Sequence, residues 1–144
     1  MLIGIDPLLS ADLLHALAAM GHGQIITIVD ANYPATRGRR LVSLPGISSP
    51  RVLRAVLSVM PLDTFVPDPA MVMQVVGDPQ AVPPVVAEMN GILSELGAAP
   101  ASVMERHGFY SMAETGYAVV QTGERRFYGC IMLVKGVLPP DPAP

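Results

Sequence analysis

Charged residues are scarce in this chain. They make up 15% of its 144 residues, whereas hydrophobic residues make up 51%. The formal net charge is -3, which argues against a general nucleic-acid binder, because such proteins carry a strongly basic surface. The one dense basic segment, residues 37–40, is interpreted as a solvated loop. A soluble chain this apolar is expected to cover part of its surface in contacts between subunits.

Cysteine and long hydrophobic runs are also nearly absent. The single cysteine, Cys130, excludes an internal disulfide and fits a reducing cytoplasm. The longest apolar runs, such as 25–29 and 131–134, are too short to span a bilayer, and residues 1–7 lack the basic segment and long apolar core of a secretory signal. The cysteine and the three scattered histidines do not have the spacing of a zinc site, so no bound metal is predicted.

The pattern that is present is an alternation of helices and strands. Helices are expected over residues 7–20, 50–60, 82–96 and 109–115, with Ser10 and Ser49 as the N-caps of the first two. Strands are expected over residues 25–29, 40–44, 71–76, 103–105, 117–122 and 131–134. This order predicts a single α/β domain over residues 1–138 with a mixed sheet, followed by an extended, proline-rich tail at 139–144.

The segment from Met20 to Ala35 is the most informative part of the chain. His22 lies between two glycines at the end of the first expected helix, and Asp30 follows the strand 25–29. Histidine exchanges protons near neutral pH, so a histidine and a carboxylate at one edge of a sheet would form a proton-transfer site. The simpler alternatives are that His22 hydrogen-bonds the last carbonyls of the helix and that Asp30 begins a turn.

Two later segments carry further candidates. Residues 122–130 are either a hairpin with 123–124 at its tip or a loop in which Tyr128 binds a polar ligand and Gly129 allows close approach. Arg106 is either a surface residue before a helix or an anchor for ligand oxygens. Cys130 has no base beside it on its own strand and is not interpreted as a nucleophile.

Three motifs occur in an order that resembles a known family. They are Met-Gly-His-Gly at 20–23, Asp-Ala-Asn-Tyr-Pro-Ala at 30–35, and Thr-Gly-Glu-Arg followed by Tyr-Gly at 122–129. Together they resemble the RbsD/FucU family of sugar mutarotases, and most closely its fucose branch. The resemblance implies a three-layer α/β/α sandwich and a sugar site without cofactor. It also implies a ring-shaped homo-oligomer, typically a decamer, with sites at subunit interfaces.

The same resemblance assigns roles to particular residues. It implies that His22 is the general acid and base, and that the sugar is bound by Asp30, Arg106, Tyr128, Gly129 and Cys130. The expected reaction interconverts the anomers of a free monosaccharide, and the expected sugar is L-fucose. A D-ribose pyranase-type isomerase and a sugar-binding protein without turnover remain as alternatives.

Two departures from the family pattern leave the preferred sugar open. Gln24 stands where many relatives have an acidic residue after Gly-His-Gly, and Cys130 stands where an asparagine is usual. A glutamine cannot favour a charged histidine as a carboxylate does, and a thiol is a weaker hydrogen-bonding group than an amide.

Overall fold

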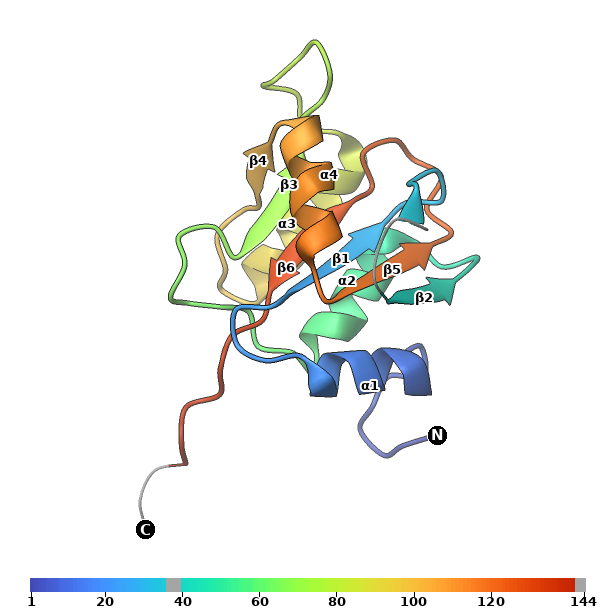
Figure 1. Ribbon diagram of the computed structural model, residues 1–144, viewed down its shortest axis with the longest axis vertical. Coiled ribbons are helices and arrows are strands. Elements are labelled where there is room, and N and C mark those ends of the chain that lie inside the picture. Colours follow the sequence, from blue (N-terminus) through green and yellow to red (C-terminus); the bar gives the residue numbers. More distant parts are fainter. Residues whose placement is uncertain (36–39, 142–144) are drawn as a thin grey trace.

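The computed structural model describes residues 1–35 and 40–141 (Figure 1). Most of the expected basic loop and the last three residues of the expected tail lie outside these ranges. Within the described ranges, no helix combines the length and the apolar composition that crossing a membrane requires.

A six-stranded mixed sheet forms the centre of the described structure. Its strands are β1 (Ile25–Val29), β2 (Leu41–Leu44), β3 (Ala70–Met73), β4 (Ser102–Met104), β5 (Ala118–Thr122) and β6 (Ile131–Val134). They lie in the order β2-β5-β1-β6-β3-β4. Strand β6 runs antiparallel to both of its neighbours, whereas the other pairs are parallel. Strands β1 to β5 therefore all end at the same edge of the sheet, and β6 begins there.

Helices cover both faces of this sheet. They are α1 (Ala11–Ala19), α2 (Ser49–Leu57), α3 (Pro84–Glu95) and α4 (Arg106–Thr115). Helices α1, α2 and α3 share one hydrophobic core with the sheet, and α4 packs on the opposite face. Side chains alternate between the two cores along β6, where Ile131 and Leu133 face the three helices and Met132 and Val134 face α4. The predicted three-layer α/β/α sandwich is confirmed.

Helix boundaries differ from the predictions where polar side chains bind the backbone. The predicted N-cap Ser10 is confirmed, because its hydroxyl accepts from the amide of Leu13. The helix therefore begins at Ala11 and not at residue 7. Helix α4 begins at Arg106, three residues earlier than predicted, because the Glu105 carboxylate accepts from the first free amides of that helix.

The predicted capping role of Ser49 is wrong. Helix α2 has Ser48 at its N-cap, and this residue makes no side-chain capping bond. Ser49 is buried instead, and its hydroxyl donates to the carbonyl of Gly129 at 2.6 Å. Ser49, in the first turn of α2, points toward the protein interior, because the loop before β6 lies against the start of this helix.

The hairpin alternative for residues 122–130 is also wrong. Strands β5 and β6 do not pair, because β1 lies between them. The connecting loop therefore passes over the end of β1. It does so in close contact with the loop before α2, since a Cβ atom on Gly123 would lie 2.3 Å from the amide nitrogen of Gly46. Only glycine fits at this crossing.

The two serine positions give a matched test of capping. Ser10→Ala removes a hydroxyl that binds the backbone, and we expect it to lower the free energy of unfolding by about 1 kcal/mol. Ser48→Ala removes a hydroxyl without such a bond and should change it by less than about 0.5 kcal/mol. Urea titration followed by circular dichroism measures both. Equal losses would contradict the assignment of the cap.

Candidate active site

A pocket lies at the edge where the parallel strands end. Its volume is ≈ 380 Å³, which suits a small ligand, and the position is the usual one for ligand sites in α/β sheets. Its polar lining consists of Asp30, Asn32, Tyr33, Arg106, Tyr110 and Tyr128, and its apolar lining of Met73, Val76, Phe127 and Cys130. Four of the predicted binding residues, Asp30, Arg106, Tyr128 and Cys130, therefore meet in one pocket.

The Asp30 side chain is fixed by the backbone amide of Asn32 and by Cys130. One carboxylate oxygen of Asp30 accepts from the amide of Asn32 at 2.9 Å, which makes the predicted turn. The Cys130 thiol lies 3.4 Å from both the Asp30 amide and the other carboxylate oxygen. Burial, and then the charge of Asp30, raises the pKa of the Cys130 thiol well above its usual value. The thiol consequently stays protonated and donates to Asp30.

Tyr128 has a strained backbone. Its φ is 65°, and no other non-glycine residue among those described has a positive φ, a conformation that is uncommon for bulky side chains. The phenol oxygen accepts from the amide of Val76 at 3.1 Å. Its proton remains available to a ligand, and the half-buried ring closes one side of the pocket.

Arg106 enters the pocket from the first position of α4. The helix start is held by Glu105, which accepts from the amides of His107 at 2.9 Å and Gly108 at 3.1 Å. These two hydrogen bonds lower the pKa of Glu105. Arg106 is itself exposed, so its planar guanidinium is free to bind the oxygen atoms of a ligand.

His22 does not lie in this pocket. It precedes the first residue of β1, whereas Asp30 follows the last, so the expectation that both lie at one edge of the sheet is wrong within a single chain. The five residues of β1 extend the backbone by roughly 13 Å between them. The alternative role for His22, binding the end of α1, is also wrong, because Lys135 Nζ donates to the carbonyls of Leu17 and Met20.

The partners of His22 come from a segment in which the sequence predicted only irregular structure. His22 Nε2 lies 3.2 Å from Asp63 Oδ1, and the ring meets Phe65 edge-on with centroids 5.5 Å apart. The Asp63 side chain is 1% exposed and that of His22 is 46% exposed. The amide of Phe65, and with it the His22 ring, lowers the pKa of Asp63 despite the opposing effect of burial. An ionised Asp63 therefore orients an accessible imidazole.

Gln24 has a conformational role beside this histidine. Its side-chain oxygen accepts from the amide of Gly21 at 2.7 Å and closes the turn that displays His22. The carboxylate that many relatives place after Gly-His-Gly is absent here, but Asp63 supplies a negative charge from another part of the chain.

Other functional candidates became visible only in the structure. Asn32, Tyr33 and Tyr110 line the pocket, and burial raises the pKa of Tyr33, so its phenol remains a donor. Gly129 is buried behind the pocket and does not line it. In the sequence, Asn32, Tyr33 and Tyr110 occupy ordinary turn and helix positions. The only signal for any of them is the motif at 30–35, which contains Asn32 and Tyr33. In the described ranges, no three His, Cys, Asp or Glu side chains are grouped so that they could hold a metal ion.

The fold and the pocket together define an α/β protein with a site for a small ligand at the edge where the parallel strands end. The family model described as "RbsD / FucU transport protein family" matches residues 3–138. The chain therefore belongs to the RbsD/FucU family.

Both fucose mutarotases and an RbsD protein are similar to this chain. A fucose mutarotase of Bos taurus is 42% identical over 144 residues, covering 95% of this chain and 94% of that protein. The structure of the fucose mutarotase from Streptococcus pneumoniae in complex with L-fucose is 34% identical, with a TM-score of 0.89 over 95% of this chain and 99% of that one. RbsD of Bacillus subtilis, solved with D-ribose, is 20% identical with a TM-score of 0.76 over 96% and 99% of the two chains, and shows the fold alone.

The Asp63 contact has a testable pH dependence. The pKa of Asp63 is lowered in the folded chain from 3.8, so the stability it contributes is present above that pH and is lost as the pH falls through the lower, folded value. Asp63→Asn should therefore reduce the free energy of unfolding near neutral pH, and the difference from the wild type should shrink in acid. Denaturant titrations along a pH series measure this. Asp78→Asn, at an exposed position, is the control, and a difference for Asp63→Asn that grows in acid would contradict the assignment.

Proposed function

We propose that this protein is a mutarotase that interconverts the α and β anomers of L-fucose. The observation that carries the proposal is the pocket that joins Asp30, Arg106 and Tyr128 in a chain whose relatives include named fucose mutarotases. A carboxylate, a guanidinium and a phenol supply the acceptors and donors that sugar hydroxyls require.

The reaction needs two coupled proton transfers. A base removes the proton of the anomeric hydroxyl while an acid protonates the ring oxygen, and the bond between the anomeric carbon and the ring oxygen breaks. The resulting aldehyde rotates about its bond to the neighbouring carbon. The reverse transfers then close the ring on the other face of the carbonyl. A group that both gives and accepts protons near neutral pH is suited to these steps.

The pocket residues have distinct roles in this proposal. Asp30 accepts hydrogen bonds from sugar hydroxyls, while Arg106 and Tyr128 donate to sugar oxygens, and one of these donors assists at the anomeric oxygen. The apolar side chains of Val76 and Phe127 favour a 6-deoxy sugar such as fucose over ribose, because they offer the methyl group of fucose an apolar contact that ribose, which lacks this group, cannot make. Cys130 contributes indirectly by holding Asp30.

His22 performs the proton transfers, and it reaches the sugar from a neighbouring subunit. Two observations support this step of the proposal. Strand β1 separates His22 from the pocket of its own chain, and the half-exposed imidazole lies beside Phe65, which is 74% exposed. Phe127 on the pocket is 76% exposed as well. Such aromatic surface is typical of interfaces, and a closed ring of ten subunits in the cytoplasm is the form that we propose.

Anomer exchange of fucose tests this function directly. Wild-type protein should accelerate the interconversion measured by saturation-transfer NMR, and His22→Ala should lose about a hundredfold or more of that acceleration. His15→Ala, which removes an exposed histidine on α1, is the matched control and should behave as the wild type.

Each other outcome favours one of the alternatives. Sugar binding without any exchange would indicate a binding protein and would contradict the proposal. Faster exchange of ribose than of fucose would indicate the pyranase-type reaction. Equal exchange in the wild type and in His22→Ala would remove His22 from the mechanism.

A further inference from the structure

The loop that carries Tyr128 lacks the regular hydrogen bonding of a strand or helix, yet it holds a strained residue. It connects β5 to β6 across the end of β1, and Tyr128 adopts a φ of 65° within it. A conformation of this kind persists only where its surroundings enforce it. The same loop contains a group of buried polar contacts around Glu124.

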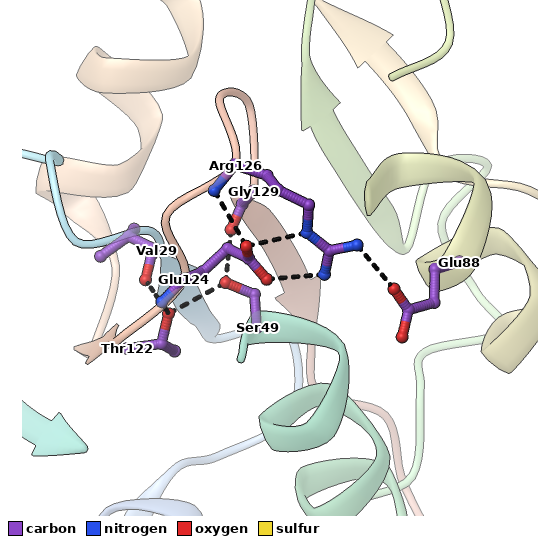
Figure 2. Close-up of polar contacts among 7 residues, drawn as sticks. All are labelled: Val29, Ser49, Glu88, Thr122, Glu124, Arg126 and Gly129. Atoms are coloured by element: carbon purple, nitrogen blue, oxygen red, sulfur yellow. Dashed lines mark hydrogen bonds and ion pairs between the residues drawn. The ribbon is translucent and has the colours of Figure 1, made fainter. Parts of the chain in front are cut away.

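The backbone of Glu124 links the loop to the strand end that carries Asp30. Its carbonyl accepts from the amide of Ala31 at 2.9 Å, and its amide donates to Thr122 Oγ1 at 3.1 Å. The Thr122 hydroxyl in turn donates to the carbonyl of Val29 at 2.8 Å (Figure 2). The segment around Asp30 and the loop before Tyr128 are therefore joined through Glu124 and Thr122.

The side chain of Glu124 is buried and fully engaged by Arg126. It is 4% exposed, and its carboxylate accepts from Arg126 N at 2.9 Å, Nε at 2.9 Å and Nη2 at 2.8 Å. Arg126 Nη1 continues to Glu88 on α3 at 3.0 Å. The Arg126 side chain, and then its backbone amide, lowers the pKa of Glu124 to about 2 against the effect of burial. The carboxylate is thus ionised and forked to a planar guanidinium, which is a directional contact.

Gly129 gives Glu124 its place behind the pocket. A Cβ atom on Gly129 would lie 2.6 Å from Cγ of Glu124 and 3.5 Å from Cβ of Asp30. The carbonyl of Gly129 accepts from Ser49 on α2. The glycine is therefore required by the glutamate packed against it, whereas the sequence had suggested close approach of a ligand.

We propose that Glu124 is a positioning residue that fixes Tyr128 and Asp30 relative to one another in the lining of the pocket. It does not line the pocket and acts through the loop that it clamps. The effect on catalysis rests on the proposed mutarotase function. The effect on Tyr128 does not, because it follows from the contacts alone.

The first test reads the position of Tyr128 without any activity. The chain has four tyrosines, so ring resonances of ¹³C-tyrosine-labelled protein can be assigned with Tyr128→Phe. Glu124→Gln keeps the shape of the side chain but loses its charge, and it should shift or broaden the Tyr128 resonance and leave that of Tyr117 in place. Arg126→Lys should give the same change. Glu95→Gln, which breaks the exposed pair with Arg54, is the control. An unchanged Tyr128 resonance in both loop variants would overturn the proposal.

The second test reads anomer exchange on the same folded samples. Glu124→Gln should lower the exchange rate at saturating fucose by about tenfold to a hundredfold. A loss of this size is expected when groups in a site move by up to about 1 Å. Glu95→Gln should leave it unchanged. If wild-type protein shows no exchange, the proposed function fails while the Tyr128 shift still stands. If the wild type is active and Glu124→Gln equals it, the positioning role is overturned.

A double-mutant cycle tests whether Gly129 is packed against the side chain of Glu124. Gly129→Ala should lower the melting temperature strongly in the wild type and much less in a Glu124→Ala background, because the nearest clashing atom is then gone. Equal losses in the two backgrounds would contradict the assigned contact between these residues.

Discussion

Strand β1 is the constraint on which the account of this protein depends. It is hydrogen-bonded to β5 on one side and to β6 on the other, and four of its five residues are buried. It is therefore rigid, and it holds His22 and Asp30 at opposite edges of the sheet. The proposed proton-transfer residue, His22, and the proposed sugar-binding carboxylate, Asp30, of one chain therefore cannot meet. A mechanism that uses both requires two copies of the chain.

The candidate side chain at each end of β1 is held in place by contacts with other parts of the chain. At one end, Asp63 and Phe65 hold the imidazole of His22 at an accessible position. At the other end, Cys130 holds Asp30, and the buried Glu124 supports the loop that carries Tyr128. Buried polar groups thus support the polar groups proposed to face a ligand, and two of them, Asp63 and Glu124, do not line the pocket themselves. This arrangement is expected where geometry must be maintained to a fraction of an ångström.

Periodicity and composition predicted the elements better than their relative placement. The bounds of β1 and β6 were predicted correctly, because each is a short, mostly apolar run. Gln24 and Asp30 flank the first run, and Cys130 and Lys135 flank the second. The hairpin at 122–130 was not correct, since nothing in the local pattern reveals that β1 lies between β5 and β6. The prediction that His22 and Asp30 share one edge failed for a different reason, because the predicted strand 25–29 itself separates the two residues.

The site was predictable where a motif fell at the end of a strand. Asp30, Arg106, Tyr128 and Cys130 do meet in one pocket. Asp63 was missed because it lies in an irregular segment without a motif, and its importance comes only from the buried contact with His22. In the sequence, Ser49 resembled a helix cap and Glu124 resembled a turn residue. In the structure both are buried, and Ser49 binds Gly129 while Glu124 binds Arg126.

The central claim, that each site combines two subunits, can be measured by complementation. His22→Ala and Asp30→Asn protein, each inactive alone, would be co-expressed with different tags, and oligomers that contain both would be purified. Random mixing restores intact sites wherever His22 of one variant meets Asp30 of the other. The account predicts about a quarter of the wild-type rate of fucose anomer exchange per site. Mixed oligomers as inactive as the parents would contradict it.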